Sequence, residues 1–235
     1  MRVIAGSAKG RQLAAVPGDS TRPITDRTKA ALFSILTSQE MVEGRRFLDL
    51  FGGTGAVGIE ALSRDAAEVV FCERDRNALR TLHRNLQTTG LASRARVIAG
   101  DAFAHLKAAG AGEFDVIYVA PPQYQGLWRR ALEMIDTRPD LLSPDGMVVV
   151  QIFPKEWQEV ALANLVQFDR RQYGSTALHF FCAASTSDFQ VPGTSDSQVP
   201  GTSNFQVPGT SGSQVPGTFE VPGTFKARVD DDERP

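Results

Sequence analysis

Acidic residues and a cluster of glycines share one short stretch of the sequence, between residues 46 and 73. Asp49 ends a short apolar run, and Gly52, Gly53 and Gly55 follow it closely. Because glycine has no Cβ atom, the backbone there can turn sharply and let a ligand approach. A G-x-G-x-x-G pattern begins at Gly53, and Glu73 ends the next apolar run, where an acid can accept hydrogen bonds from ribose hydroxyls. This spacing predicts a site for a nucleoside-containing cofactor.

The acid that precedes the glycines bears on which cofactor binds. A carboxylate at Asp49 would repel the pyrophosphate of a dinucleotide and would attract an ammonium group. S-adenosylmethionine has an amino-acid end, a sulfonium and no phosphate, so we expect it as the cofactor. Two alternatives stay open: a nucleotide-dependent oxidoreductase, from the glycine pattern alone, and a glycine-rich turn that binds no ligand.

A third acid, Asp101, follows another apolar run, at 96–99. Its carboxylate could accept a hydrogen bond from an adenine amino group, or it could cap a helix over 102–108. The carboxyl ends of successive parallel strands open onto one crevice. We therefore expect Asp49, Glu73 and Asp101 to line the same crevice.

Apolar patterns with strand and helix periods alternate around these acids. Strands are expected over 47–51, 69–72, 96–99, 114–119 and 146–152, and a closing hairpin over 167–173 and 177–182. Helices are expected over 57–62, 75–86, 102–108, 124–135 and 156–165. This layout predicts an α/β, Rossmann-like class I methyltransferase fold, with a mostly parallel seven-stranded sheet and a terminal antiparallel hairpin.

The first 40 residues read as a basic extension, a β-hairpin followed by a helix. Val3, Ile4 and Leu13 predict two short strands, and Thr25 or Asp26 could cap a helix. Residues 1–30 hold six Lys or Arg and two Asp, a local charge of +4 (six minus two). Such a segment suits phosphate contacts, although a solvated edge hairpin would look the same. The candidate RNA-binding residues are Lys9, Arg11, Arg22, Thr25 and Arg27.

Composition limits the remaining possibilities. The 235-residue chain has a net charge of −2, which by itself does not indicate a nucleic-acid partner. No apolar run is long enough to span a membrane and no signal peptide opens the chain, so we expect a cytoplasmic protein with no membrane partner. Cys72 and Cys182 each end an apolar run and are expected to be buried rather than to form a disulfide or a metal site. We expect a monomer.

Three parts of the chain differ in composition: the extension at 1–40, the core at 41–184 and a tail at 185–235. In the tail, V-P-G-T recurs five times between Val191 and Thr224. A repeat with so few apolar positions cannot bury a core, so the tail is expected to be disordered.

Longer motifs resemble one family. R-V-I-A-G-x-x-K-G-R-x-L, T-R-P-I-T-D-R-x-K-x-A-L-F and D-L-F-G-G-T-G-A-V-G-I-E-A-L-S-R are similar to segments of the RsmD family, and the resemblance covers residues 1–183. It implies S-adenosylmethionine-dependent methylation of the exocyclic N2 amine of a guanine in 16S rRNA. The implied partner is 16S rRNA or the assembling small ribosomal subunit. The implied cofactor-binding residues are Asp49, Phe51, Gly52, Gly53, Gly55, Glu73, Arg74, Asp101 and Ala102.

The resemblance also implies a catalytic loop after the fourth strand, with a departure from the family pattern. That strand normally ends in D-P-P-Y/F, whose polar side chain and proline carbonyl accept hydrogen bonds from the target amine. Here the sequence is Ala120-Pro121-Pro122-Gln123-Tyr124. We favour Gln123 as the amide acceptor and Tyr124 as the base-stacking face. The backbone carbonyls of Ala120 and Pro121 could instead suffice, or methyl transfer could be impaired, which would leave a cofactor-binding rRNA-binding or ribosome assembly factor.

Overall fold

The structure, a computed structural model, describes residues 1–16 and 24–184. The V-P-G-T tail and Arg22 lie outside the described residues, so the expectations for them stay predictions.

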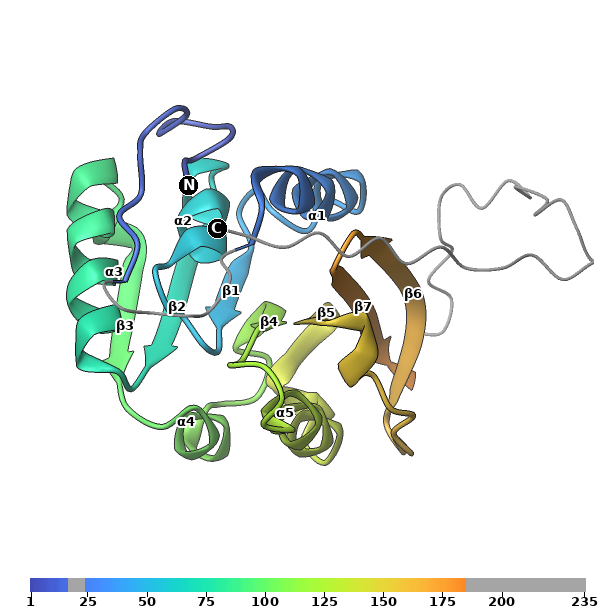
Figure 1. Cartoon of the computed structure of the whole chain (residues 1–235). Helices are drawn as coiled ribbons and strands as arrows, with labels where there is room; N and C mark the ends of the chain where they lie inside the picture. The colour runs from blue at the N-terminus through green and yellow to red at the C-terminus, as the bar shows by residue number, and fades with distance from the viewer. Residues whose placement is uncertain (17–23, 185–235) are drawn as a thin grey trace, which may run out of the picture. The chain divides into compact units, whose positions relative to one another are not determined.

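The described residues build a seven-stranded sheet in the order β3-β2-β1-β4-β5-β7-β6 (Figure 1). Neighbouring strands from β3 to β5 are parallel, and β7 runs antiparallel to both β5 and β6. The strands are β1 (Arg46–Asp49), β2 (Glu68–Glu73), β3 (Ala95–Ala99), β4 (Phe114–Val119), β5 (Leu142–Ile152), β6 (Leu165–Tyr173) and β7 (Thr176–Ala183). This sheet confirms the predicted fold class. The strand order reverses between β1 and β4, and such a switch point leaves a crevice at the carboxyl ends of the strands.

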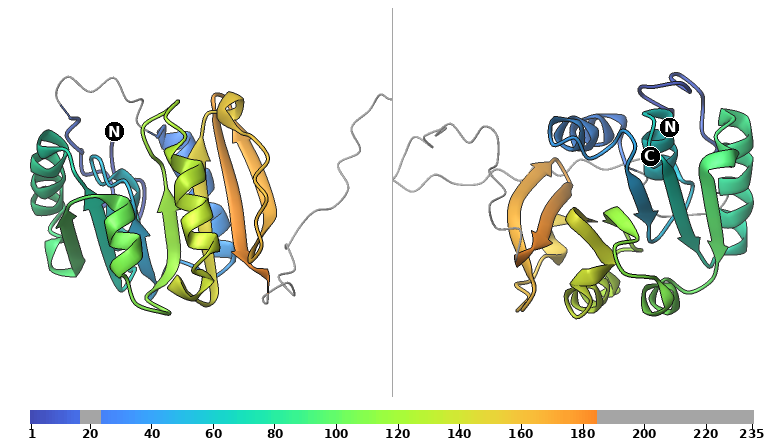
Figure 2. Two further views of the ribbon diagram at one scale, coloured as in Figure 1. Left: turned by 90° about the horizontal axis from the view of Figure 1, so that it is seen from below. Right: turned by 180° about the vertical axis from the view of Figure 1, so that it is seen from behind.

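Helices cover both faces of the sheet. One face carries α1 (Asp26–Ser38), α2 (Ala56–Ser63) and α3 (Arg76–Thr89), and the other carries α4 (Ala102–Ala108) and α5 (Leu127–Asp136). Seen from below, α4 and α5 lie in front of the strands (Figure 2). No helix in the described ranges is both long and apolar enough to cross a membrane.

Burial on both faces explains why the central strand β4 is apolar at every position except Asp115. Every residue of Phe114–Val119 is buried. Successive side chains of a strand point to opposite faces. In β7, accordingly, Phe180 packs with the core under α1, α2 and α3, and Phe181 packs with the core under α4 and α5.

Capping residues set the helix ends as the sequence indicates. The Thr25 hydroxyl accepts the Thr28 N–H at 3.1 Å, so Thr25 rather than Asp26 caps α1. Asp75 caps α3, and Gly90 ends it in the left-handed conformation. Each cap supplies a partner for backbone groups that the helix itself leaves unpaired.

The expected amino-terminal hairpin has one isolated bridge, between Arg2 and Gln12, in place of two regular strands, and three backbone hydrogen bonds join its arms: Val3 N–H to Arg11, Gly10 N–H to Val3 and Leu13 N–H to Met1. This segment also bonds to α2. The N–H groups of Ile4 and Ala5 donate to the Glu60 carboxylate, and that of Ser7 donates to the Ser63 carbonyl.

Two helix predictions need correction. The helix expected over 124–135 begins only at Leu127, because Tyr124 and Gly126 have positive φ angles. The helix expected over 156–165 is absent: a single 3-10 turn, η3 (Pro154–Glu156), is followed by irregular chain. There the Asp136 carboxylate accepts the N–H groups of residues 163–165 at 2.8–2.9 Å, which leads the backbone into β6 instead.

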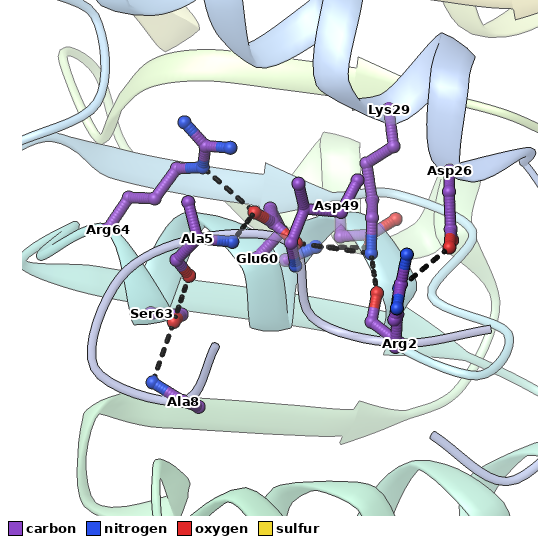
Figure 3. Close-up of polar contacts among 11 residues, drawn as sticks. Arg2, Ala5, Ala8, Asp26, Lys29, Asp49, Glu60, Ser63 and Arg64 are labelled. Carbon is purple, nitrogen blue, oxygen red and sulfur yellow. Dashed lines mark hydrogen bonds and ion pairs between the residues drawn. The ribbon is translucent and has the colours of Figure 1, made fainter. Parts of the chain in front are cut away.

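A buried ion pair ties the amino-terminal segment to the core (Figure 3). Lys29 Nζ of α1 lies 3.1 Å from Glu60 Oε2 of α2, and both side chains have no exposed surface. Lys29 also donates to the Arg2 carbonyl at 2.7 Å, and Arg64 Nε donates to Glu60 at 2.9 Å. Burial lowers the pKa of Lys29, and Glu60 opposes that shift. Because the remaining donors and acceptors are also satisfied, the pair suits a structural role.

We predict that Lys29→Met lowers the free energy of unfolding by about 3 kcal/mol, because it leaves a buried carboxylate without its main cation. Adding Glu60→Gln should recover part of that loss. Arg2→Met is the matched control, since it removes only the exposed pair with Asp26 and should cost less than about 1 kcal/mol. Urea denaturation measures all three, and equal losses for Lys29→Met and Arg2→Met would contradict the structural role.

Candidate functional site

A cavity of about 940 Å³ opens at the carboxyl ends of β1, β2, β4 and β5. It brings together most of the residues expected at the site: Thr25, Asp49, Phe51, Gly52, Gly53, Glu73, Arg74, Asp101, Ala102, Ala120, Pro121, Pro122 and Gln123. The amino-terminal segment adds Ala15 and Val16, and the β6–β7 turn adds Ser175 and Thr176. Gly55 and Tyr124 are not among the lining residues.

Asp49 is a buried carboxylate that lines this cavity. It is 3% exposed, and its Oδ2 accepts the Gly58 N–H at 3.3 Å. Burial raises the pKa of Asp49 to about 7, with a smaller contribution from Glu73, while the Gly58 hydrogen bond opposes the shift. No ion pair to Asp49 forms within residues 1–16 and 24–184. A cation in the cavity would therefore stabilise the ionised form.

Glu73 is fixed by backbone donors. Its Oε2 accepts the Gly53 N–H at 2.8 Å, and its Oε1 accepts those of Arg74 and Asp75 at 2.8 and 2.7 Å. These bonds join the glycine turn after β1 to the end of β2. Oε1 thus accepts two hydrogen bonds and Oε2 only one, so Oε2 has a further lone pair that can accept from a ligand hydroxyl.

The glycines of the turn divide between two roles. Gly53 has a φ of +52° and lines the cavity, which fits close approach of a ligand. Gly55 has a φ of +78°, and a Cβ there would lie 2.4 Å from Leu82 Cδ1. A Cβ on Gly58 would lie 2.3 Å from the Phe71 ring. The last two glycines of the pattern thus allow α2 to pack closely on its neighbours.

Asp101 does cap α4, because its Oδ1 accepts the N–H groups of Phe103 and Ala104 at 3.0 and 2.9 Å. It also lines the cavity, so the two expectations for it are compatible. The adenine contact itself stays a prediction.

The loop after β4 separates its two candidate substrate-binding side chains. Gln123 lines the cavity, whereas Tyr124 is 69% exposed and stacks on Phe153, with 5.9 Å between ring centroids. The Tyr124 backbone has a φ of +58°, and its N–H donates to Glu156 Oε2 at 2.8 Å. Because Phe153 lines the cavity, the Tyr124 ring lies next to the opening and is accessible to a base.

Sequence reasoning missed the pair Tyr118 and Gln151, which lie on adjacent strands and line the cavity. The Tyr118 hydroxyl donates to Gln151 Oε1. Burial, with a smaller contribution from Asp49, raises the pKa of Tyr118, so this hydroxyl stays protonated as a donor. Gln151 is a polar residue in the otherwise apolar run of β5, and that was the available signal.

The candidate RNA-binding residues lie mostly outside the cavity. Lys9, Arg11 and Arg27 are exposed, and the Arg11 guanidinium donates to the Thr88 carbonyl at 3.1 Å. Thr25 caps α1 and lines the cavity. Their proposed contacts with RNA stay predictions.

Metal-binding side chains do not cluster in the described ranges, where no group of three or more His, Cys, Asp or Glu could hold an ion. Cys72 and Cys182 are both buried, as expected, and their thiols are free.

Comparison with protein families gives a match over residues 1–182 to the family model described as "Conserved hypothetical protein 95". The chain is 38% identical over 183 residues to "Putative rRNA methyltransferase YlbH" of Bacillus subtilis, covering 77% of this chain and 98% of that protein. It is 33% identical to "Ribosomal RNA small subunit methyltransferase D" of Haemophilus influenzae, covering 67% and 84%.

Comparison with solved structures also finds a protein described as a methyltransferase. The chain superposes on "Putative methyltransferase yhhF from Escherichia coli" with a TM-score of 0.66 and 30% identity, over 77% of this chain and 96% of that one. The class I methyltransferase fold is therefore supported by a solved structure as well as by the strand order.

We predict that Gly55→Ala destabilises the protein without a direct effect on ligand contacts. The cost should combine about 1–2 kcal/mol for the left-handed backbone with about 1–3 kcal/mol for overpacking against Leu82. Gly90→Ala is the matched control, because its φ of +74° is similar and its Cβ would meet nothing within 4 Å. Thermal or urea unfolding should give a clearly larger loss for Gly55→Ala; equal losses would refute the packing role.

Proposed function

The chain belongs to the RsmD family, and from that premise we propose that it is an S-adenosylmethionine-dependent methyltransferase that modifies the exocyclic N2 amine of a guanine in 16S rRNA. The observation that carries the proposal is the buried Asp49 carboxylate in the cavity at the strand ends. The substrate is 16S rRNA, free or within the assembling small ribosomal subunit.

The charges of the cavity support this cofactor over a dinucleotide. The described lining residues include four acids, Asp49, Glu73, Asp75 and Asp101, and one base, Arg74. A pyrophosphate would meet net negative charge there, whereas an ammonium and a sulfonium would be attracted. We assign the amino-acid end to Asp49, the ribose hydroxyls to Glu73 and the adenine to the neighbourhood of Asp101.

When bound, S-adenosylmethionine would supply an electrophilic methyl carbon on its sulfonium. The protein's task is to place the guanine N2 lone pair in line with that carbon. Ala120 has no side-chain acceptor, so the Gln123 amide oxygen would accept from the amine; the alternative acceptors are the backbone carbonyls of Ala120 and Pro121. Tyr124, exposed beside the opening, would stack on the base once it leaves its own stack.

A second function has one observation in its favour. Ala120 stands where the family pattern has an acid or amide, which suits a cofactor-binding assembly factor with impaired catalysis. Under that alternative the natural protein would be inactive and Ala120→Asp would gain activity. Activity of the natural protein would exclude it.

The activity test uses methyl-labelled S-adenosylmethionine with unmodified small-subunit rRNA and with small subunits. We expect label in N2-methylguanosine after nucleoside digestion. Gln123→Ala should lower kcat about tenfold, the value of one hydrogen bond of about 1.4 kcal/mol in the transition state. Gln125→Ala, in the same loop but exposed and outside the cavity lining, should leave kcat unchanged. Absence of label in guanine from both RNA substrates would overturn the proposal.

Cofactor affinity should depend on pH through Asp49. Its pKa in the free protein is about 7, so it is mostly neutral below that pH and ionised above it. Because a cationic ligand binds the ionised form, affinity should fall about tenfold as pH drops from 8 to 6.

Asp49→Asn is the reference for this pH effect, since the titration of the ligand itself contributes equally to both proteins. It should bind more weakly and should lack the part of the pH dependence that Asp49 contributes. Calorimetry at several pH values measures both. The same pH profile for the two proteins would show that Asp49 does not interact with the cationic end.

A further inference from the structure

Helix α3 carries a basic stripe, which we define as Arg76, Arg80 and Arg84. Their spacing of four residues places them on one face of the helix. All three are exposed, and so is His83 beside them. The helix sequence Arg76–Thr89 contains no acidic residue. The stripe is therefore a local concentration of positive charge on a chain whose net charge is −2.

The fold makes little use of these three side chains. Among residues 1–16 and 24–184, none of them takes part in an ion pair, and Arg80 donates only to the Asn77 side chain. By contrast, the guanidinium of Arg94 donates to the carbonyls of Leu62 and Ala66. Like charges four residues apart on a helix repel one another and destabilise it. A binding partner with negative charge would remove that cost.

The position of the stripe links it to the candidate site. α3 begins directly after Arg74 and Asp75, and both of these and Asn77 line the cavity. The stripe thus starts at the cavity and leads away from it along α3, over about 12 Å from Arg76 to Arg84. That length corresponds to about three or four nucleotides at a rise of about 3.4 Å each.

A second basic segment lies against the same helix. Ala14 and Asn85 exchange two hydrogen bonds, at 2.8 and 3.1 Å, and Arg11 reaches the Thr88 carbonyl near the end of α3. Figure 1 shows the amino-terminal segment running beside α3 and α2. Lys9 and Arg11, both exposed, therefore extend the positive surface beyond the stripe.

We propose that the stripe binds the phosphate backbone of the RNA substrate beside the cavity in which its guanine is methylated. This inference depends on the proposed function, because it names a surface for the same substrate. Guanidinium groups match phosphate oxygens in geometry and stay charged at all physiological pH values. Phosphate contacts position an RNA without reading its sequence, whereas the cavity selects the base.

The test compares two double variants of the full chain. Arg80→Gln/Arg84→Gln removes two charges of the stripe but spares Arg76, which adjoins the cavity lining. Lys107→Gln/Arg170→Gln removes two exposed charges from α4 and from the edge strand β6, away from α3. Arg80→Lys/Arg84→Lys keeps the charge and should retain most of the affinity.

Fluorescence anisotropy with a labelled fragment of the rRNA substrate gives the dissociation constant as a function of salt. The stripe variant should bind at least tenfold more weakly at low salt, and the slope of log K against log salt should fall by about two, one for each lost phosphate contact. KM for RNA should rise, while kcat at saturating RNA and affinity for S-adenosylmethionine should not change. The control variant should match the natural protein.

The inference would be overturned by unchanged RNA affinity in the stripe variant, or by an equal loss of RNA affinity in the control variant. A loss of S-adenosylmethionine binding in the stripe variant would also overturn it, because the stripe would then belong to the cofactor site or support folding. Failure of the proposed function is recognised separately. In that case the natural protein itself would neither bind nor methylate the RNA, and the inference would fall with it.

Discussion

The sheet buries the Asp49 carboxylate, and no cation from residues 1–16 or 24–184 pairs with it. Asp49 is 3% exposed at the end of β1, and this burial raises its pKa to about 7, although one long hydrogen bond from Gly58 opposes the shift. A buried charge of this kind destabilises the folded protein as pH rises toward and through 7, unless a positive ligand compensates. The neighbouring cavity offers space for such a ligand, and Glu73 and Asp101 line the same space.

A second buried carboxylate shows what a purely structural solution looks like in the same fold. Glu60 has no exposed surface, yet it pairs with Lys29 and Arg64 and accepts two backbone N–H groups. Its charge is compensated entirely from within the chain, and it holds the amino-terminal segment against α2. Glu60 thus has cationic partners within the chain, whereas Asp49 has none among the described residues. This contrast is the physical reason to place a cationic ligand at Asp49.

The sequence predicted the structure well where local patterns determine it. It predicted the structure less well where contacts between residues far apart in the sequence determine it. Apolar patterns predicted where the strands lie along the chain, and the acids at or just after the ends of β1, β2 and β3 (Asp49, Glu73 and Asp101) were expected at one crevice, where they line the cavity. The helix expected over 156–165 failed because Asp136, far along the chain, captures the backbone N–H groups there. The expected cofactor contact of Gly55 stays a prediction, and the structure adds a packing reason for this glycine, its close contact with Leu82, which spacing alone could not reveal. The hydrogen bond between Tyr118 and Gln151 could not be predicted either, because it depends on two strands being neighbours in the sheet.

The most direct test of the central claim is a crystal structure of the protein with S-adenosylmethionine or its demethylated product. The account predicts the amino-acid end near Asp49, the ribose hydroxyls within hydrogen-bonding distance of Glu73, and the sulfonium facing the loop that carries Gln123. An empty cavity at saturating ligand, or a ligand whose adenine occupies the end nearest Asp49, would contradict it.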